Sequence, residues 1–589
     1  MKIRTLITFI VSITVVLTLA GCGENTVVGT PTTSTLADSQ TCIGCHGTAV
    51  SPVTGAVIAE EWKLSRHNTE TSGKKFPGFG AGCRDCHEPQ AGHPNNCGRC
   101  HGGPPSANNV TGLDVSDNPD RDLKCFKCHH TNTLGAPHFN NLTSSGYPAS
   151  FVSSQNLGKC RNCHNPHDPT TRMAVNTQWA ASGHGDTTAG PWRSYDFKTR
   201  GNTIPAPLTY GAICVRCHTT TGFINFVTSN FTDVHAWGVS TDKTKEVLGC
   251  NACHDDGAGN AYSFKVRKVL GNGVGISAYY NYSGPRSAVS VKINNVATRY
   301  PDAASSNLCV LCHVGRANGA VIKRADLAGL DFGNVSRISS HDFPAGANLY
   351  QRGGFEFYTS AARYAHYFKH DRIGMNNESS TGYMGPCIAC HMSSPAKHSF
   401  MPLSSAGTTI QAITATACAN CHKPTTYGDF TLTPALLQEQ KDGLTAALAV
   451  IRALEIQRNL YVLNPTTQRW GYTTNWNAPF GAGVVPGSGG GINNTDALHA
   501  GAYTMGVSFN YALISADPGA YAHNSIYIRM LIYDSIDWLY NGAMDLDTEA
   551  AISWLFANGK INSTTRDTAL AYLQGTAATP SGAGGTRPH

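Results

Sequence analysis

The pattern of apolar and polar residues is helical in the last third of the chain. After a Thr433-Pro434 start, which is typical of the first turn of a helix, apolar residues recur at helical spacing and form one stripe. The stripe contains Leu437, Leu444, Leu448 and Ile451. The segment "NSIYIRMLIYDSIDWLYNG" predicts a second helix, capped by Asn524 and ended at Gly542, and "DTEAAISWLFANG" predicts a third. We therefore expect residues 423–589 to form a helical C-terminal domain.

Residues 260–300 have a different pattern, with alternating and β-branched runs such as "SFKVRKVLGNGVGISAYY" and "AVSVKI". Such runs are typical of strands, and we expect a small β-rich insertion here, with a hairpin turn near Gly271-Asn272-Gly273. This segment contains no Cys and no His.

The first apolar run, "TLITFIVSITVVLTLA", follows the short basic start "MKIR" and ends at "LAGC". With about sixteen residues it is short for a membrane span, which is the alternative interpretation, and its small-residue end favours cleavage. We interpret residues 1–21 as a signal peptide. The pattern resembles a bacterial lipobox, which implies lipid attachment at Cys22, and Gly23 implies no inner-membrane retention signal. Residues 22–40 are small, polar and rich in Thr, as expected for a flexible tether.

Composition points to a loop-rich chain. Only 14% of the 589 residues are charged, and there are 61 Gly and 29 Pro. These values exclude a coiled coil and a long charged disordered tail. No other apolar run is long enough to span a bilayer.

Twenty of the 21 cysteines form ten C-x-x-C-H motifs, and the remaining one is Cys22. The motifs are Cys42/Cys45/His46, Cys83/Cys86/His87, Cys97/Cys100/His101, Cys125/Cys128/His129, Cys160/Cys163/His164, Cys214/Cys217/His218, Cys250/Cys253/His254, Cys309/Cys312/His313, Cys387/Cys390/His391 and Cys418/Cys421/His422. Seven fall in residues 41–259, which we expect to form an N-terminal haem domain, and three in a second haem segment, 301–422. None falls in residues 423–589, so we expect the helical C-terminal domain to carry no covalent haem.

This spacing is the one that covalent haem attachment needs. Two thiols three residues apart add to the two vinyl groups at one porphyrin edge, and the next His binds the iron. Zinc sites are an alternative, but zinc does not require His directly after every second Cys. Disulfides are another, but a disulfide framework does not repeat one five-residue pattern. We predict ten covalently bound haem c groups.

The ligand on the other face of each iron decides its role, because a second His gives an electron carrier and an open position gives a catalyst. Fourteen histidines lie outside the motifs, enough for ten pairs of His ligands. The candidate distal ligands are His67, His93, His130, His138, His167, His184, His235, His341, His366, His398 and His523. In "RYAHYFKH" either His366 or His370 suffices; His499 and His589 are weaker candidates, and His589 is interpreted as a free tail.

Two of these histidines imply closely packed haems. His130 directly follows the motif ligand His129 and cannot reach the opposite face of the same porphyrin, since one peptide unit spans only about 3.8 Å. As a ligand it must serve a different haem; the alternative is a hydrogen-bonding surface residue. His167, three residues beyond its motif, leads to the same expectation.

A repeated pattern, W-x-x-S-x-H, supports two others. It runs from Trp62 to His67 and from Trp179 to His184, and each copy lies between two C-x-x-C-H motifs. We interpret it as a repeated unit with Trp packed on porphyrin and His on iron.

Charge gives no reason to expect a nucleic-acid partner. The formal net charge is +6, of which Lys2 and Arg4 leave with the signal peptide. Ten ferric haems with two His ligands contribute about −1 each, so the loaded protein is acidic at about −6, and Lys and Arg are expected to pair with propionates.

With the lipobox, the ten motifs and the segment "GAYAHNSIYIRMLIYDSIDWL", the chain resembles the outer-surface multihaem c-type cytochromes of metal-respiring, Geobacter-like bacteria. The resemblance implies a mainly α and irregular fold with a loop-rich, haem-packed core. It implies an outer-membrane lipoprotein that conducts electrons at the cell surface. The implied partners are other c-type cytochromes, a porin–cytochrome complex and extracellular metal oxides.

Two other functions stay open. One is a multihaem oxidoreductase of the nitrite, hydroxylamine or sulfur-oxyanion type, with one open-faced haem, although all ten motifs here end in His. The other is a subunit of an extracellular cytochrome filament. The flavin chemistry of decahaem surface reductases is not expected, because they carry an extra cysteine pair and no cysteine is spare here.

Overall fold

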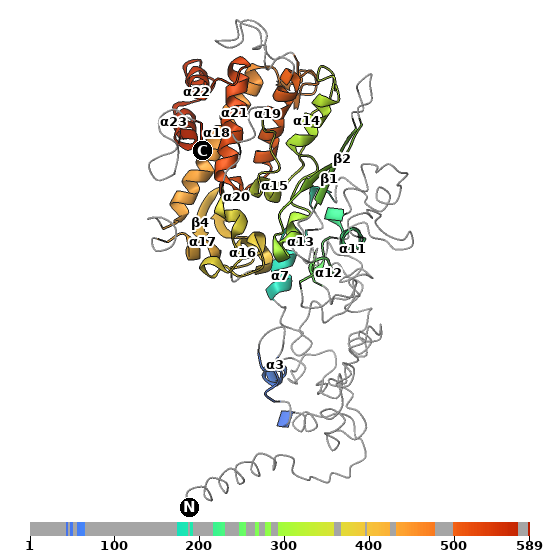
Figure 1. The fold of residues 1–589 in the computed structure, drawn as a ribbon. Coiled ribbons are helices and arrows are strands. Elements are labelled where there is room, and N and C mark those ends of the chain that lie inside the picture. Colours follow the sequence, from blue (N-terminus) through green and yellow to red (C-terminus); the bar gives the residue numbers. More distant parts are fainter. Residues whose placement is uncertain are drawn as a thin grey trace, which may run out of the picture. The chain divides into compact units, whose positions relative to one another are not determined.

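The computed structural model describes mainly the C-terminal half of the chain, together with short stretches before it (Figure 1). The described residues are 43–44, 47–50, 56–64, 174–186, 189–191, 216–229, 247–254, 266–269, 277–283, 292–357, 364, 367–394, 397–423, 431–477, 499–574 and 587–588. The chain divides into two compact units, one of residues 1–130 with 160–173 and the other of residues 131–159 with 174–589. The predicted signal peptide and tether lie outside the described residues.

In the first unit the structure describes one helix, α3 (Ile58–Leu64). Its Trp62 side chain is buried, and an isolated bridge joins Val50 to Val57 just before the helix. Trp62 begins the first copy of W-x-x-S-x-H, whose His67 lies outside the described residues.

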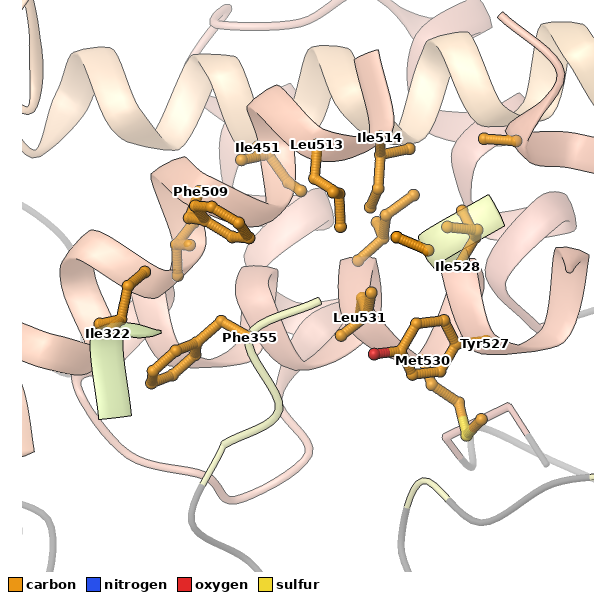
Figure 2. Packing of buried hydrophobic residues seen from close by; sticks show 14 of the residues in the cluster. Ile322, Phe355, Ile451, Phe509, Leu513, Ile514, Tyr527, Ile528, Met530 and Leu531 are labelled. Carbon is orange, nitrogen blue, oxygen red and sulfur yellow. The ribbon is translucent and has the colours of Figure 1, made fainter. Parts of the chain in front are cut away.

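The core of the second unit is built from helices near the C-terminus. These helices are α14 (Gly319–Leu327), α15 (Ala345–Leu349), α18 (Pro434–Gln457), α19 (Ala500–Ser515), α20 (Ala520–His523), α21 (Ser525–Asn541), α22 (Thr548–Ala557) and α23 (Ser563–Gln574). Helix α18 packs against α21 and α23, and α19 packs against α14 and α21. Figure 2 shows side chains of α14, α18, α19 and α21 meeting around Phe355, including Ile322, Ile451, Phe509 and Leu531.

The three helices predicted from the hydrophobic pattern are confirmed with their capping residues. Thr433 accepts a side-chain hydrogen bond from the Leu436 amide at the start of α18. Asn524 accepts one from the Tyr527 amide at the start of α21, which ends at Gly542 in the left-handed conformation (φ 79°). The third predicted helix is α22.

Helix α19 has no counterpart in the sequence analysis. Thirteen of its sixteen residues are buried, so it lacks the polar face that reveals a surface helix. Gly506 brings the helix close to the loop after α15, since a Cβ there would lie 2.2 Å from the Phe355 ring. Helix α23 was also not predicted.

Three two-stranded antiparallel sheets complete the described part of the fold. Their strands are β1 (Ser277–Ser283) with β2 (Lys292–Arg299), β3 (Leu403–Ala406) with β4 (Thr409–Ile413), and β5 (Tyr461–Leu463) with β6 (Trp470–Tyr472). The first pair lies inside the predicted insertion, 260–300. Its connection falls between Ser283 and Lys292, so the hairpin turn predicted near Gly271 is wrong. The Asn-Gly signal is local, whereas the pairing register depends on both strands.

Short helical segments carry the remaining described residues. They are α7 (Ala174–Ala180), α11 (Thr220–Thr228), α12 (Cys250–Cys253), α13 (Asn307–Val310), α16 (Pro386–His391), α17 (Thr416–Cys421) and the 3-10 turns η3 (Ala304–Ser306), η5 (Lys369–Arg372), η6 (Glu378–Ser380) and η7 (Lys397–Ser399). Among the described residues, no helix has both the length and the apolar character needed to cross a membrane.

Candidate haem-binding site

Each fully described C-x-x-C-H motif forms about one turn of helix that leads into its histidine. The motif segments include α12, α13, α16 and α17, and residues 216–218 are also helical. The histidine amide donates to the carbonyl of the first cysteine at 2.8 Å for His254 and His422, and at 3.0 Å for His313. Positions i, i+3 and i+4 share one face of a helix. The two thiols and the imidazole therefore lie on the same side, as attachment to one porphyrin requires.

The turn at α16 depends on a glycine. Gly385 has φ of 82°, and a Cβ there would lie 1.9 Å from the Ala303 carbonyl oxygen. Pro386 follows at the first helical position, where its missing N–H costs no hydrogen bond. The sequence Gly-Pro thus starts the helix that presents Cys387, Cys390 and His391.

Each of the five motif histidines that the structure describes lies opposite a histidine from outside the motifs. The ring-centre distances and interplanar angles are 6.2 Å and 88° for His313 with His184, 6.0 Å and 68° for His218 with His341, 6.1 Å and 28° for His254 with His398, 6.1 Å and 32° for His391 with His523, and 5.9 Å and 83° for His422 with His370.

These separations fit two ligands of one metal ion. An imidazole nitrogen binds a metal at about 2 Å and lies about 1 Å from its ring centre, so two rings on opposite sides of one ion have centres about 6 Å apart. Rings packed directly on each other come closer, as His184 and Phe400 do at 4.6 Å. Among the described residues no group of three or more His, Cys, Asp and Glu is arranged to hold a metal ion. The unit that recurs among the described residues is a pair of imidazoles, which is the number of ligands that an iron with four porphyrin nitrogens would need.

Hydrogen bonds at Nδ1 orient several of these rings. The acceptors are the carbonyl oxygens of Phe343 for His313 (3.2 Å), Ala522 for His370 (2.6 Å) and Phe400 for His391 (2.8 Å). Because a carbonyl oxygen can only accept, Nδ1 must carry the proton in each ring. The Nε2 lone pair of each ring is then available for a metal, the usual second-shell arrangement of metal-binding histidines.

Burial keeps most of these imidazoles neutral, which is the form that binds a metal. It lowers the pKa of His184, His218, His370 and His391 to about 4, helped by neighbouring histidines. Burial also lowers the pKa of four further ligand candidates, His313, His341, His398 and His422.

His523 is the exception, because a buried carboxylate lies beside it. Burial by itself lowers its pKa, but Asp517 outweighs burial and raises it. The two Asp517 oxygens lie 2.9 Å from His523 Nδ1, and the Asp517 side chain is only 1% exposed. Asn348 and the Gly519 amide also donate to this carboxylate, at 2.8 and 3.1 Å.

The thiols of different motifs meet one another. The Cys217 side chain is within hydrogen-bond range of Cys312, and Cys309 is within range of Cys387. All nine described cysteines are free of disulfide bonds and partly buried. Burial raises the pKa of Cys250 and Cys253 to about 11. The attachment points of neighbouring motifs are therefore adjacent in the fold.

Four predicted distal ligands lie opposite a described motif histidine, namely His184, His341, His398 and His523. The fifth such residue is His370, whereas the sequence analysis favoured His366, which lies outside the described residues. His499 stacks on Tyr503, with its Nδ1 2.5 Å from Asp326 Oδ2. Sequence reasoning did not find Asp517, Phe343 or Phe400, because two of them act through backbone carbonyls that no residue pattern marks.

The other predicted site residues lie outside the described residues. They are Cys22, Cys42, Cys45, Cys83, Cys86, Cys97, Cys100, Cys125, Cys128, Cys160, Cys163 and Cys214, the motif histidines His46, His87, His101, His129 and His164, and His67, His93, His130, His138, His167, His235, His366 and His589.

The second copy of W-x-x-S-x-H has a local structural basis. The Trp179 indole N–H donates to the Leu248 carbonyl at 2.9 Å, two residues before the motif that begins at Cys250. Ser182 Oγ donates to the Trp179 carbonyl at 2.7 Å and accepts from the His184 amide at 3.3 Å. The pattern thus ties His184 to a neighbouring haem-binding motif.

Paired imidazoles over adjacent C-x-x-C-H turns define a multihaem c-type cytochrome. The chain is homologous to polyheme c-type cytochromes of Geobacter. It is 30% identical to the C-type polyheme cytochrome OmcB of Geobacter sulfurreducens over 521 residues, which cover 76% of this chain and 65% of that protein. It is 33% identical to OmcC of the same species over 419 residues, which cover 67% of this chain and 50% of that protein.

The chain thus spans between half and two thirds of the length of these curated relatives. No family model matches it. No solved structure matches it either.

Proposed function

We propose that this protein is a decahaem electron conduit. Ten haems would be attached at the ten C-x-x-C-H motifs, each iron held by the motif His on one face and a second His on the other. When bound, haem supplies reversible one-electron chemistry at iron, with a potential set by its ligands, their hydrogen bonds and burial.

The observation that carries the proposal is the set of five imidazole pairs with ring centres 5.9–6.2 Å apart. An iron with two His ligands has no open position for a substrate, so it carries electrons and does not bind a reactant. The chain's contribution is to hold the rings, keep them neutral by burial and fix Nδ1–H on carbonyl acceptors.

We further propose that the protein works at the cell surface, as an outer-membrane lipoprotein anchored through Cys22. Its partners would be other c-type cytochromes or a porin–cytochrome complex on one side, and extracellular metal oxides or cytochromes as acceptors. The lipobox and the homology to Geobacter polyheme cytochromes support this placement.

The test is a count of haem and of its spin state in the purified, oxidised protein. Haem content by pyridine haemochrome should give ten per chain, and low-temperature EPR should show only low-spin iron. His184→Ala should then convert one haem to high spin, whereas His499→Ala should not. A high-spin haem in the unaltered protein would contradict the conduit and favour an enzyme with an open-faced haem.

A further inference from the structure

Phe400, which directly follows η7, contacts ligand candidates of three different haem sites. Its ring lies 4.6 Å from the His184 ring, edge to face, and 6.1 Å from the His398 ring. Its carbonyl oxygen accepts the Nδ1–H of His391 at 2.8 Å. These three histidines belong to three different imidazole pairs, those of His313, His254 and His391.

The backbone at Phe400 is in an uncommon conformation. Its φ is 57°, in the left-handed region that non-glycine residues rarely adopt. Such a conformation persists where the surroundings enforce it, and it is frequent at functional sites. Here it lets one residue turn its carbonyl toward His391 while its ring faces His184 and His398.

Independent contacts bring the same segments together. The His398 amide donates to Gln178 Oε1 of α7 at 3.1 Å, so the segment that carries His184 is tied to η7. The Cys309 and Cys387 side chains, from the motifs of His313 and His391, are within hydrogen-bond range. Neither contact involves Phe400, so the three sites are neighbours for reasons beyond this residue.

We propose that Phe400 is the positioning residue of a three-haem junction, where its ring sets the planes of His184 and His398 and its carbonyl sets that of His391. The proposal rests on the proposed function, since it assumes that these histidines bind haem iron. It adds that the haem sites of His254, His313 and His391 would share one positioning residue, so that a change at Phe400 acts on more than one of them.

Phe343 provides a matched control. It also has a left-handed φ, 53°, and its carbonyl also accepts from a motif histidine, His313, at 3.2 Å. Its side chain, however, is 56% exposed. Replacing Phe343 by Ala therefore tests the loss of an aromatic side chain at a left-handed position, without a ring between ligands.

The experiment compares Phe400→Ala, Phe400→Gly and Phe343→Ala with the unaltered protein by low-temperature EPR and by spectroelectrochemical titration. The EPR signal of a low-spin ferric haem depends on the angle between its two imidazole planes. Loss of the Phe400 ring should change the signals of two haems, those whose imidazole planes lie at 88° (His184–His313) and 28° (His254–His398). Both reduction potentials should shift downward, because water then reaches the ligands and favours ferric iron. Phe343→Ala, at a residue whose carbonyl accepts from His313, should leave the signal of the His254–His398 pair in place, and Phe400→Tyr should keep the signals of the unaltered protein.

Phe400→Gly separates the ring from the backbone, since glycine adopts a left-handed φ without strain. Changes common to the Ala and Gly variants belong to the ring. If both match the Phe343→Ala spectrum while haem content stays at the unaltered value, the junction is refuted. If Phe400→Ala loses haem, Phe400→Leu is measured in its place, and unchanged spectra there likewise refute a role for the aromatic ring. An unaltered protein without low-spin signals would refute the proposed function itself.

Discussion

Replacing Asp517 with Asn should raise the reduction potential of the haem that we propose is held between His391 and His523. Asp517 is buried and accepts from His523 Nδ1 at 2.9 Å, so its charge acts on this ligand with little screening. Burial raises the pKa of Asp517, but His523, Asn348 and the Gly519 amide outweigh it and lower the pKa, which keeps the carboxylate ionised. A nearby negative charge stabilises ferric iron, and its removal favours the ferrous state.

The size of the shift follows from Coulomb's law. The imidazole ring separates the carboxylate from a metal at Nε2 by about 7 Å, and at an effective dielectric constant of about 20 one charge at that distance is worth about 2 kcal/mol. For a one-electron couple, in which about 59 mV corresponds to a factor of ten, the expected rise is about 100 mV. Asn has the same shape, and its one acceptor oxygen can take the place of Oδ1, which accepts from the Gly519 amide and His523; the hydrogen bond from Asn348 to Oδ2 is lost.

The assay is a redox titration followed by EPR of the signals from the near-parallel pairs, His254–His398 at 28° and His391–His523 at 32°; only one of these two should change its potential. Asp326→Asn is the matched control, because Asp326 contacts His499, which lies opposite none of the described motif histidines. It should leave every potential unchanged. An Asp517→Asn protein with full haem content and unaltered potentials would refute the reasoning.

Three further predictions follow from the described geometry. The five imidazole pairs should give EPR signals of two kinds, since three have plane angles of 68–88° and two of 28–32°; a single kind of low-spin signal would contradict these angles. Arg587→Ala should lower the free energy of unfolding by about 3–5 kcal/mol in denaturant titration. In the unaltered protein Arg587 donates to the fully buried Asp534 at 2.8 Å, and the variant leaves this carboxylate without that partner. A loss below about 1 kcal/mol would show that the pair is dispensable. Burial raises the pKa of Glu455 from 4.5 to about 7, against the lowering effect of Arg452, so the folded state holds this proton more tightly than the unfolded state. The free energy of unfolding should therefore fall as pH rises from about 4.5 to 7. Glu455→Gln should flatten the pH profile of the melting temperature in that window.

Local signals in the sequence were sufficient for part of the fold. Helices α18, α21 and α22 were predicted because each has an apolar stripe or a cap that acts within a few residues, as Thr433, Asn524 and Gly542 do. Helix α19 was missed because it is buried on nearly all sides, so its environment and not its periodicity defines it. The turn of the β1–β2 hairpin was misplaced because register is a property of two strands.

The sequence by itself determined the chemistry of attachment. A C-x-x-C-H motif places two thiols and an imidazole on one helical face, and this depends only on residues within five positions. The class of protein therefore follows from the chain alone, together with the expectation that surplus histidines serve as second ligands.

Only the tertiary structure decided which histidines face each other. His313 meets His184, His218 meets His341, and His422 meets His370, and in each case the partner comes from a segment distant in sequence. The same holds for Asp517 beside His523 and for Phe400 among three ligand pairs. No local pattern encodes these contacts, because they arise only when separate segments pack around shared sites.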